Sequence, residues 1–182
     1  MKLNRSEFQD YIHSYEIDEI FYRDLYLAEK EHPETFMKYC QELDHELIAS
    51  RRLYVPALSK EAWYPYVEEN DMFHDFTGNI MLCKHYRYSP VFTHEHEFFE
   101  ILCIYNGTAH TTIQGISHTL STGDICIIPP HTKHNIGIFD DSIAINILVR
   151  TSTFQTTFFQ SLTADSSLAQ FFAHVLFHKT EG

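Results

Sequence analysis

Short apolar runs of strand-forming residues recur between residues 80 and 149, and turn-forming residues separate them at regular intervals. This spacing is typical of consecutive antiparallel strands. It predicts strands at 80–86, 98–105, 108–113, 116–120, 125–128, 135–139 and 142–149. So many short strands in so short a segment predict an antiparallel sandwich or barrel.

Three of the predicted turns carry residues suited to unusual backbone angles. Asn106-Gly107 suits a type I′ hairpin, and both Gln114-Gly115 and Thr122-Gly123-Asp124 supply a glycine for positive φ. We therefore expect tight connections at all three points.

Helical spacing of apolar residues precedes the strands. Residues 6–50 predict two amphipathic helices separated by a break at His32-Pro33, and Ser6 with Gln9 forms a capping-box pattern at the start. Residues 51–79 contain several prolines and aromatic residues and are expected to be irregular or short extended structure.

After Arg150 helical spacing returns in a strongly apolar tail. We divide the chain into a helical segment at 1–55, a β-barrel at 56–150 and C-terminal helices at 151–182. The tail can dock on the barrel or pair with a twofold mate, and its apolar residues fill more than one helix stripe, which favours a dimer contact. These residues are Phe154, Phe158, Leu162, Leu168, Phe171, Phe172, Val175 and Leu176.

Charge and cysteine usage exclude several classes. The 182-residue chain has a formal net charge of -12, so it lacks the basic footprint of a protein that binds DNA by itself. Its four cysteines form no CxxC pair and are expected to be buried thiols in a reducing compartment. The chain shows no signal-peptide pattern and no apolar run of membrane-spanning length, so we expect a cytoplasmic protein without a membrane partner.

Thirteen histidines justify a search for clustered ligands, and one cluster stands out. His94, His96 and Glu100 lie at even spacings, so on an extended strand all three point to one face. His134 follows a turn, an apolar strand and a Pro-Pro exit, and can supply a fourth ligand from across the barrel. Three imidazoles and a carboxylate suit one divalent transition metal, namely Zn, Ni, Fe, Mn or Co. The same residues can instead form a hydrogen-bonded polar floor, and their spacing does not separate the two readings.

The two stretches resemble the motifs of the cupin superfamily. His94, His96, Glu100 and Gly107 fit the spacing of the first motif, and Gly123, Pro129 and His134 fit that of the second. The resemblance implies a mainly β, cupin-like (double-stranded β-helix) antiparallel barrel, with α-helices flanking it at both the N- and C-terminal ends. Three positions depart from the motifs: Tyr88 and His131 stand where glycine is usual, and Ile138 where asparagine is usual.

Residues 80–180 resemble more specifically the N-terminal sensor domain of AraC-family transcription regulators from bacteria. The segments HEHEFFEILCIYNG (94–107) and LSTGDICIIPPHTKH (120–134), and the run from Ile143 into the Phe-rich tail, carry this resemblance. It implies a small-molecule effector, such as a sugar or metabolite, a homodimer, and DNA binding only through a C-terminal helix-turn-helix region. This chain shows no such region, and we expect it to be a fragment cut just before it.

Further residues are candidates for effector contact. Phe98 and Tyr105 can line an aromatic cavity, and His131 can lie near its mouth, although core packing for the first two and a solvated turn for the third are the simpler readings. Phe99, Ile101 and Cys103 face away from Glu100 yet are apolar, so a flanking helix is expected to cover them.

These features predict a ligand-sensing and dimerising domain of a transcription regulator, with no catalytic residues. Two other classes remain open at this point. One is a metal-dependent cupin enzyme, such as a dioxygenase or isomerase, whose metal would polarise the substrate or activate oxygen. The other is a stand-alone sugar-binding barrel.

Overall fold

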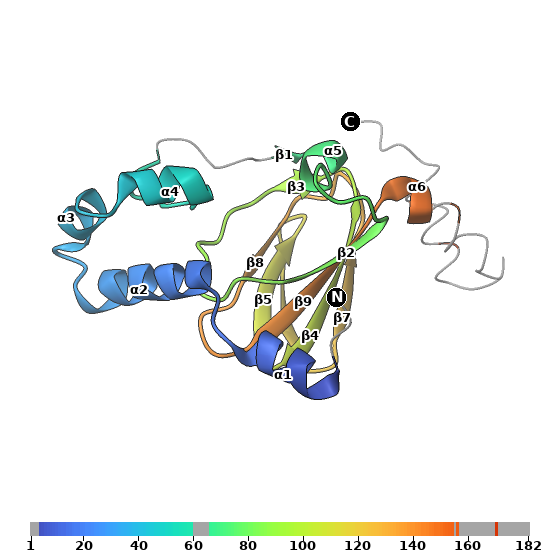
Figure 1. The fold of residues 1–182 in the computed structure, drawn as a ribbon, viewed down its shortest axis with the longest axis horizontal. Coiled ribbons are helices and arrows are strands. Elements are labelled where there is room, and N and C mark those ends of the chain that lie inside the picture. The colour runs from blue at the N-terminus through green and yellow to red at the C-terminus, as the bar shows by residue number, and fades with distance from the viewer. Residues whose placement is uncertain (1–3, 60–65, 155, 157–169, 171–182) are drawn as a thin grey trace.

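A computed structural model of the chain describes residues 4–59, 66–154, 156 and 170, and its centre is a pair of facing β-sheets (Figure 1). One sheet has the order β2-β9-β4-β7, formed by Ile80–Lys84, Ile143–Val149, Phe99–Asn106 and Ile125–Ile128. The other has the order β6-β5-β8, formed by Ile116–Ser121, Thr108–Ile113 and His134–Gly137. The neighbouring strands within both sheets are antiparallel, and a third, parallel pair joins β1 (Tyr66–Val67) to β3 (Glu95–His96). The predicted antiparallel, cupin-like β class is confirmed, with two open sheets in place of one closed ring of hydrogen bonds.

The connection at Asn106-Gly107 is not the predicted type I′ hairpin. β4 pairs with β7 and β9, and β5 pairs with β6 and β8, so the turn carries the chain from one sheet to the other. Only Gly107 has a positive φ, of 80°, and a Cβ there would meet the side chain of Ser142. The hairpin with two positive φ angles lies instead at Gln114-Gly115, between β5 and β6.

The main core lies between the two sheets. It contains side chains from the inner faces of four strands and from the segment that follows β8. The side chains of the intervening residues on each strand point to the opposite, outer face of the sheet. Its buried members are Leu102, Ile104, Ala109, Ile136, Ile138 and Ala144. On the same inner face of β4, Glu100 takes the position two residues before Leu102, so the sheet alternation places a carboxylate inside the molecule.

The outer face of the four-stranded sheet is apolar, as the sequence predicted for Phe99, Ile101 and Cys103. Phe154, directly after α6 (Thr151–Thr153), stacks on Phe99 with ring centroids 3.8 Å apart. Both rings are fully buried, so the chain leaving β9 covers this part of the face. The predicted tail helices beyond this point lie outside the described residues.

The N-terminal region contains four helices where two were predicted. They are α1 (Arg5–His13), α2 (Ile17–Glu31), α3 (Phe36–Gln41) and α4 (His45–Arg51). Each extra boundary has a local cause: Glu16 and Glu19 form a capping box that starts α2, and the Asp44 side chain accepts a hydrogen bond from Leu47 N–H to start α4.

The capping box of α1 was also misplaced, because Asn4 and Glu7 form it rather than Ser6 and Gln9. Between residues 51 and 79, which were expected to be irregular or short extended, the structure has the two-residue β1 and one short helix, α5 (Glu69–Met72). Residues 60–65 lie outside the described part of this stretch.

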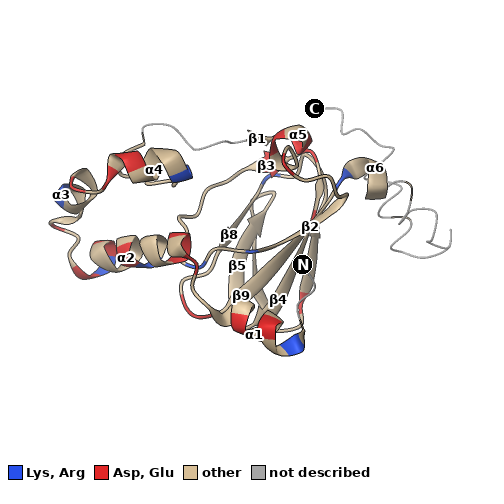
Figure 2. Ribbon diagram, viewed as in Figure 1, with Lys and Arg blue, Asp and Glu red and all other residues tan. Residues whose placement is uncertain are grey.

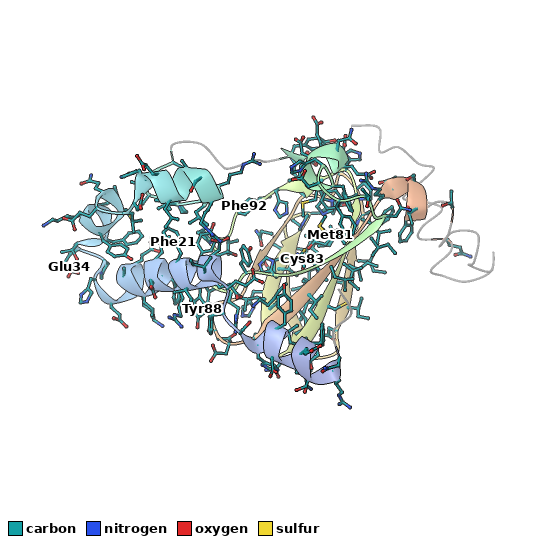
Figure 3. All side chains as sticks on the ribbon, in the orientation of Figure 1. Phe21, Glu34, Met81, Cys83, Tyr88 and Phe92 are labelled. Carbon is teal, nitrogen blue, oxygen red and sulfur yellow. The ribbon has the colours of Figure 1, made fainter. Side chains whose placement is uncertain are left out.

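Helices α2, α3 and α4 form an extension beside the sheets (Figure 1) with a small core of its own, made by Tyr22, Leu25, Cys40, Leu53 and Val55. Tyr86 and Tyr88 pack against this core from the segment after β2, and Figure 3 labels Phe21 and Tyr88 at the contact.

A buried ion cluster fastens the extension to the sheet. The Glu19 carboxylate of α2 has no exposed surface and lies 2.6 Å from Lys84 Nζ and 2.8 Å from Arg87 Nε. Both cations also donate to the Ser14 carbonyl, and the Arg87 guanidinium stacks over the Tyr15 ring. The other charged residues lie mainly on the helices and in the connecting segments, while the strands carry few (Figure 2).

Candidate functional site

Four side chains predicted from the sequence converge between the sheets. His96 ends β3, Glu100 lies on β4, and His134 begins β8, while His94 stands just before β3. The backbones of His94 and His134 form a reciprocal pair of hydrogen bonds of 2.9 Å. This bridge brings the two motifs, forty residues apart in the chain, side by side.

The Glu100 carboxylate is the centre of this cluster. Its Oε2 lies 3.1 Å from His96 Nε2 and 3.4 Å from His134 Nε2. The ring centroids of His94 and His134 are 4.2 Å apart, and donor atoms of His94, Glu100 and His134 all lie within 4.8 Å of one another. His96, Glu100 and His134 are buried. We call these four residues the histidine cluster; the metal-binding role predicted for them stays a prediction.

Burial and mutual contacts determine the protonation of the cluster. Burial, together with the nearby His134, lowers the pKa of His94 to about 4, so this imidazole is neutral near pH 7 and keeps a lone pair. Burial by itself would raise the pKa of Glu100, but its contacts with His134 and His96 outweigh that effect and hold the pKa well below the ordinary value. A neutral imidazole beside an ionised carboxylate is the state in which both can bind a metal.

The hydrogen bond of His134 makes the cluster incomplete. Its Nδ1 lies 2.8 Å from the Thr132 carbonyl, which can only accept, so Nδ1 carries the proton. Its Nε2 faces the Glu100 carboxylate, so either a proton on Nε2 or a cation must lie between these two atoms. Within the described part of the chain, His134 Nε2, His96 Nδ1 and Glu100 Oε1 are buried without a hydrogen-bond partner.

The three predicted effector contacts lie in different places. The Phe98 ring stacks on His96 at 4.3 Å and contacts Phe73, so it belongs to the wall of the cluster. Tyr105 lies five residues beyond Glu100 on β4 and packs against Phe8 and His13 around α1. The structure therefore does not bring Tyr105 to the cluster, and its effector contact is a prediction that nothing in its surroundings supports.

His131 lies at the rim. Its backbone N–H donates to the His96 carbonyl at 2.8 Å, and its exposed ring stacks on Tyr66. It lines a surface cavity of about 490 Å³ together with Thr93, Glu95, Thr112, Gln114, Gly115 and Lys133. This cavity adjoins the histidine cluster without including any of its four residues.

The departures from the cupin motifs have structural consequences. Tyr88 and His131, which stand where the motifs have glycine, adopt φ angles of 62° and 59° in the left-handed region. The backbone has thus kept the conformation that glycine allows, at some cost in strain. Ile138, in place of the usual asparagine, belongs to the main core.

Sequence reasoning missed two polar residues near the cluster, His85 and Asn146. Asn146 pairs with Leu102 in β4 and with Cys83 in β2, so it shares the inner face of the sheet. The strand alternation from Leu148 back to Ala144 could have revealed it, since Asn146 is the one polar residue in that run of β9.

Comparisons with known proteins agree with this picture. The sequence model of the AraC-like ligand binding domain matches residues 81–179, more than half of the chain. The chain belongs to this family. The histidine cluster, the main core and the turn at Gly107 all lie in the part that matches the AraC-like ligand binding domain, whereas helices α1 to α4 precede it.

Relatives with described functions match a shorter segment. The HTH-type transcriptional activator RhaS of Yersinia pestis, and that of Yersinia pseudotuberculosis, are each 33% identical to this AraC-like domain over 57 residues. The match covers 31% of this chain and 21% of the RhaS protein, so the chain corresponds to about a fifth of the relative.

Two solved structures show partial similarity to this chain. KdgF from Halomonas sp. has a TM-score of 0.37 and 26% identity, covering 41% of this chain and 72% of its own. An RmlC-like cupin from Shewanella frigidimarina has a TM-score of 0.38 and 22% identity, covering 42% of this chain and 70% of its own.

None of the helices in the described ranges has the length and apolar character needed to cross a membrane.

Proposed function

We propose that this AraC-like ligand binding domain is the sensor of a bacterial transcription regulator and binds a small effector between its two sheets. The family match and the histidine cluster within it support this function. In this proposal a helix-turn-helix region of the full regulator contacts DNA, and the net charge of -12 on this chain agrees with that division of roles. The domain itself carries out no reaction in this proposal, and it acts in the cytoplasm.

We also propose the division of the domain that the sequence predicted. In this proposal residues 1–55 are the helical segment, 56–150 the effector-binding part, and 151–182 the segment that links to the helix-turn-helix region and pairs with a second copy. A sensor changes its output only if the effector has different affinities for two arrangements of the protein. The buried contact of Glu19 with Lys84 and Arg87 provides a rigid element through which such a change can reach the helices.

His94, His96, Glu100 and His134 hold a divalent transition metal in this proposal. The single observation that carries it is the His134 ring, whose Nδ1 is fixed by the Thr132 carbonyl and whose Nε2 faces the Glu100 carboxylate. A metal ion satisfies both acceptors, and imidazole with carboxylate suits Zn, Ni, Fe, Mn or Co. A bound metal would act as a Lewis acid toward an oxygen atom of the effector.

Metal analysis of protein purified without added metal tests this proposal. We expect about one equivalent in the wild type and a loss of it in His96→Ala, which removes a ligand. His118→Ala is the matched control, because His118 is exposed on β6, a strand that carries none of the four cluster residues. Unchanged metal content in His96→Ala, with the fold intact by circular dichroism, would refute the ligand set. A metal-free wild type would favour the alternative in which the four residues form a hydrogen-bonded polar floor.

A further inference from the structure

The surface cavity of about 490 Å³ lies on the outer side of the segments that carry the histidine cluster. Glu95 lies between His94 and His96 in the chain, so strand alternation points its side chain away from the cluster. Lys133 is exposed and directly precedes the buried His134. The volume is in the range of known small-molecule sites. This hollow is therefore separate from the space between the two sheets.

Hydrogen bonds hold the frame of the cavity in place. Gln114 N–H donates to the Lys133 carbonyl at 2.8 Å, which joins the β5–β6 hairpin to the segment before β8. The Asn135 side chain accepts from Thr112 N–H at 3.1 Å and donates to Thr93 Oγ1 at 3.4 Å. A ligand that binds to such a frame loses little free energy in ordering the protein.

Four polar side chains around the cavity are left without a polar partner. Within the ranges that the structure describes, none of the four makes a side-chain hydrogen bond or an ion pair; they are Glu95, Gln114, His131 and Lys133. The carboxylate of Glu95 and the ammonium group of Lys133 line one cavity without pairing with each other, so there is room for another group between them. Water or a ligand must satisfy these side chains.

Two of the four residues have strained backbone conformations. The φ angles of Gln114 and His131 are 49° and 59°, in the left-handed region that favours glycine. His131 gains its stacking on Tyr66, and Gln114 gains no side-chain hydrogen bond from the described part of the chain. Strained residues that persist without such compensation cluster at ligand-binding sites.

The charges around the cavity favour a ligand with one group of each sign. Glu95 would repel a simple anion, and Lys133 would repel a simple cation. A neutral ligand would remove water from both charges and offer no counter-charge. A compound that carries both an ammonium group and a carboxylate satisfies Glu95 and Lys133 together. The Gln114 amide and the His131 ring supply further hydrogen bonds to it.

We propose that this cavity is a second small-molecule site, which binds a free amino acid in its zwitterionic form. Lys133 binds the carboxylate of the ligand, and Glu95 binds its ammonium group. The site lies outside the space between the sheets, so the inference does not depend on the proposed effector binding.

Calorimetric titration of the whole chain with amino acids tests the proposal. The probes are glycine, L-serine, L-glutamine, β-alanine and 4-aminobutyrate, which vary the side chain and the distance between the two charges. Each is compared with its N-acetyl derivative, which lacks the cation, and with its amide, which lacks the anion. We expect at least one amino acid to bind, and each of its two derivatives to bind about tenfold more weakly, the loss of one hydrogen bond to a charged group.

Substitution of the two charged residues locates the binding. Glu95→Gln and Lys133→Met should each weaken the amino acid by about tenfold. In Glu95→Gln the preference over the N-acetyl derivative should disappear, and in Lys133→Met the preference over the amide, because each variant lacks the group that recognises that charge. Lys38→Met and Glu42→Gln are the matched controls, since these residues form an exposed ion pair at α3 and do not line the cavity.

Thermal unfolding separates a ligand contact from a structural role. Glu95→Gln and Lys133→Met should leave the unfolding midpoint of the ligand-free protein nearly unchanged, because no described residue pairs with either side chain. His131→Gly should raise the midpoint by relieving backbone strain and yet weaken the amino acid by about fivefold. A residue retained only for packing would not give this combination.

Several results would overturn the inference and leave the proposed sensor function standing. They are no binding of any amino acid in the series, equal binding of the charge-blocked derivatives, and unchanged affinity in both Glu95→Gln and Lys133→Met. A large fall in the unfolding midpoint of these two variants would assign the residues to the fold. Loss of binding in Glu100→Gln, with none in the two cavity variants, would place the amino acid between the sheets. That last result would support effector binding there and reject the second site.

Discussion

Glu19 and Glu100 are both buried carboxylates, but they differ in the groups that surround their negative charges. Glu19 faces Lys84 and Arg87, and its oxygens accept from both side chains and from the Arg87 and Glu16 backbone N–H groups. Glu100 faces only imidazoles, and its Oε1 has no partner in the described residues. Glu19, whose oxygens all accept hydrogen bonds, holds two parts of the fold together. Glu100, which keeps an unsatisfied oxygen, is suited to bind a ligand.

The largest expected loss of stability follows substitution of Glu19. Glu19→Gln leaves Lys84 and Arg87 buried without their counter-charge, and it should cost about 3–5 kcal/mol of unfolding free energy. Urea unfolding followed by circular dichroism measures it. Asp18→Asn is the control: the partner of Asp18, Arg51, is partly exposed, so this change should cost less than about 1 kcal/mol. Equal losses of unfolding free energy in Glu19→Gln and Asp18→Asn would contradict the role assigned to Glu19.

A smaller effect is expected at the histidine cluster. Glu100→Gln should cost about 1.5–3 kcal/mol, the value of a hydrogen bond to a charged group. A buried imidazole can exist as a neutral ring, whereas Lys84 and Arg87 cannot become neutral without a large penalty. The same unfolding experiment applies, and a cost above that of Glu19→Gln would contradict the distinction.

Acid should weaken the Glu19 contact in a defined direction. Burial favours the protonated form of Glu19, but hydrogen bonds from Arg87, Lys84 and the backbone outweigh burial, so its pKa lies below the ordinary value. The unfolded chain then binds this proton first, and stability is lost as the pH falls from about 4.3 toward the folded-state pKa. The loss is at most about 1.4 kcal/mol per pH unit. Wild type and Glu19→Gln should therefore converge at low pH, and a constant difference would argue against the assignment.

The smallest effect concerns backbone strain at the rim of the cluster. His131→Gly should stabilise the protein by up to about 1 kcal/mol, because glycine adopts positive φ without a steric penalty. The matched change His118→Gly, in the exposed strand β6, should instead destabilise it by about 0.5–1 kcal/mol. Thermal unfolding of His131→Gly and His118→Gly shows whether each change raises or lowers the unfolding midpoint. A lower midpoint for His131→Gly would show that the stacking of His131 on Tyr66 outweighs the backbone strain.

Local patterns predicted much of this molecule. The short apolar runs and the turns between them located the seven strands of the two sheets, because these signals are local. The single extended strand expected for His94, His96 and Glu100 was wrong, since His96 ends β3 and Glu100 lies on β4. The pairing of strands is not local. Asn106-Gly107 is equally compatible with a hairpin and with a crossing to the other sheet, and only the partners of β4 and β5 decide between them.

Contacts between distant segments were also beyond the sequence. Glu19 lies 68 residues before Arg87, and nothing around Glu19 marks it as buried rather than as part of a solvated helix face. His85 was overlooked for a related reason, since its neighbours Lys84 and Tyr86 look like the end of a strand at the surface. Glu19 acquires its role from the docking of α2 onto the end of β2 and the segment after it.

Calorimetric titration of Zn²⁺ into three folded proteins tests the central claim most directly. Wild type and Glu19→Gln should each take up one equivalent at the histidine cluster, because Glu19 only fastens the helices. Glu100→Gln should lose that binding, because its amide cannot replace the carboxylate as a charged ligand. Equal Zn²⁺ binding by Glu100→Gln and wild type would contradict the account, and so would its loss in Glu19→Gln alone.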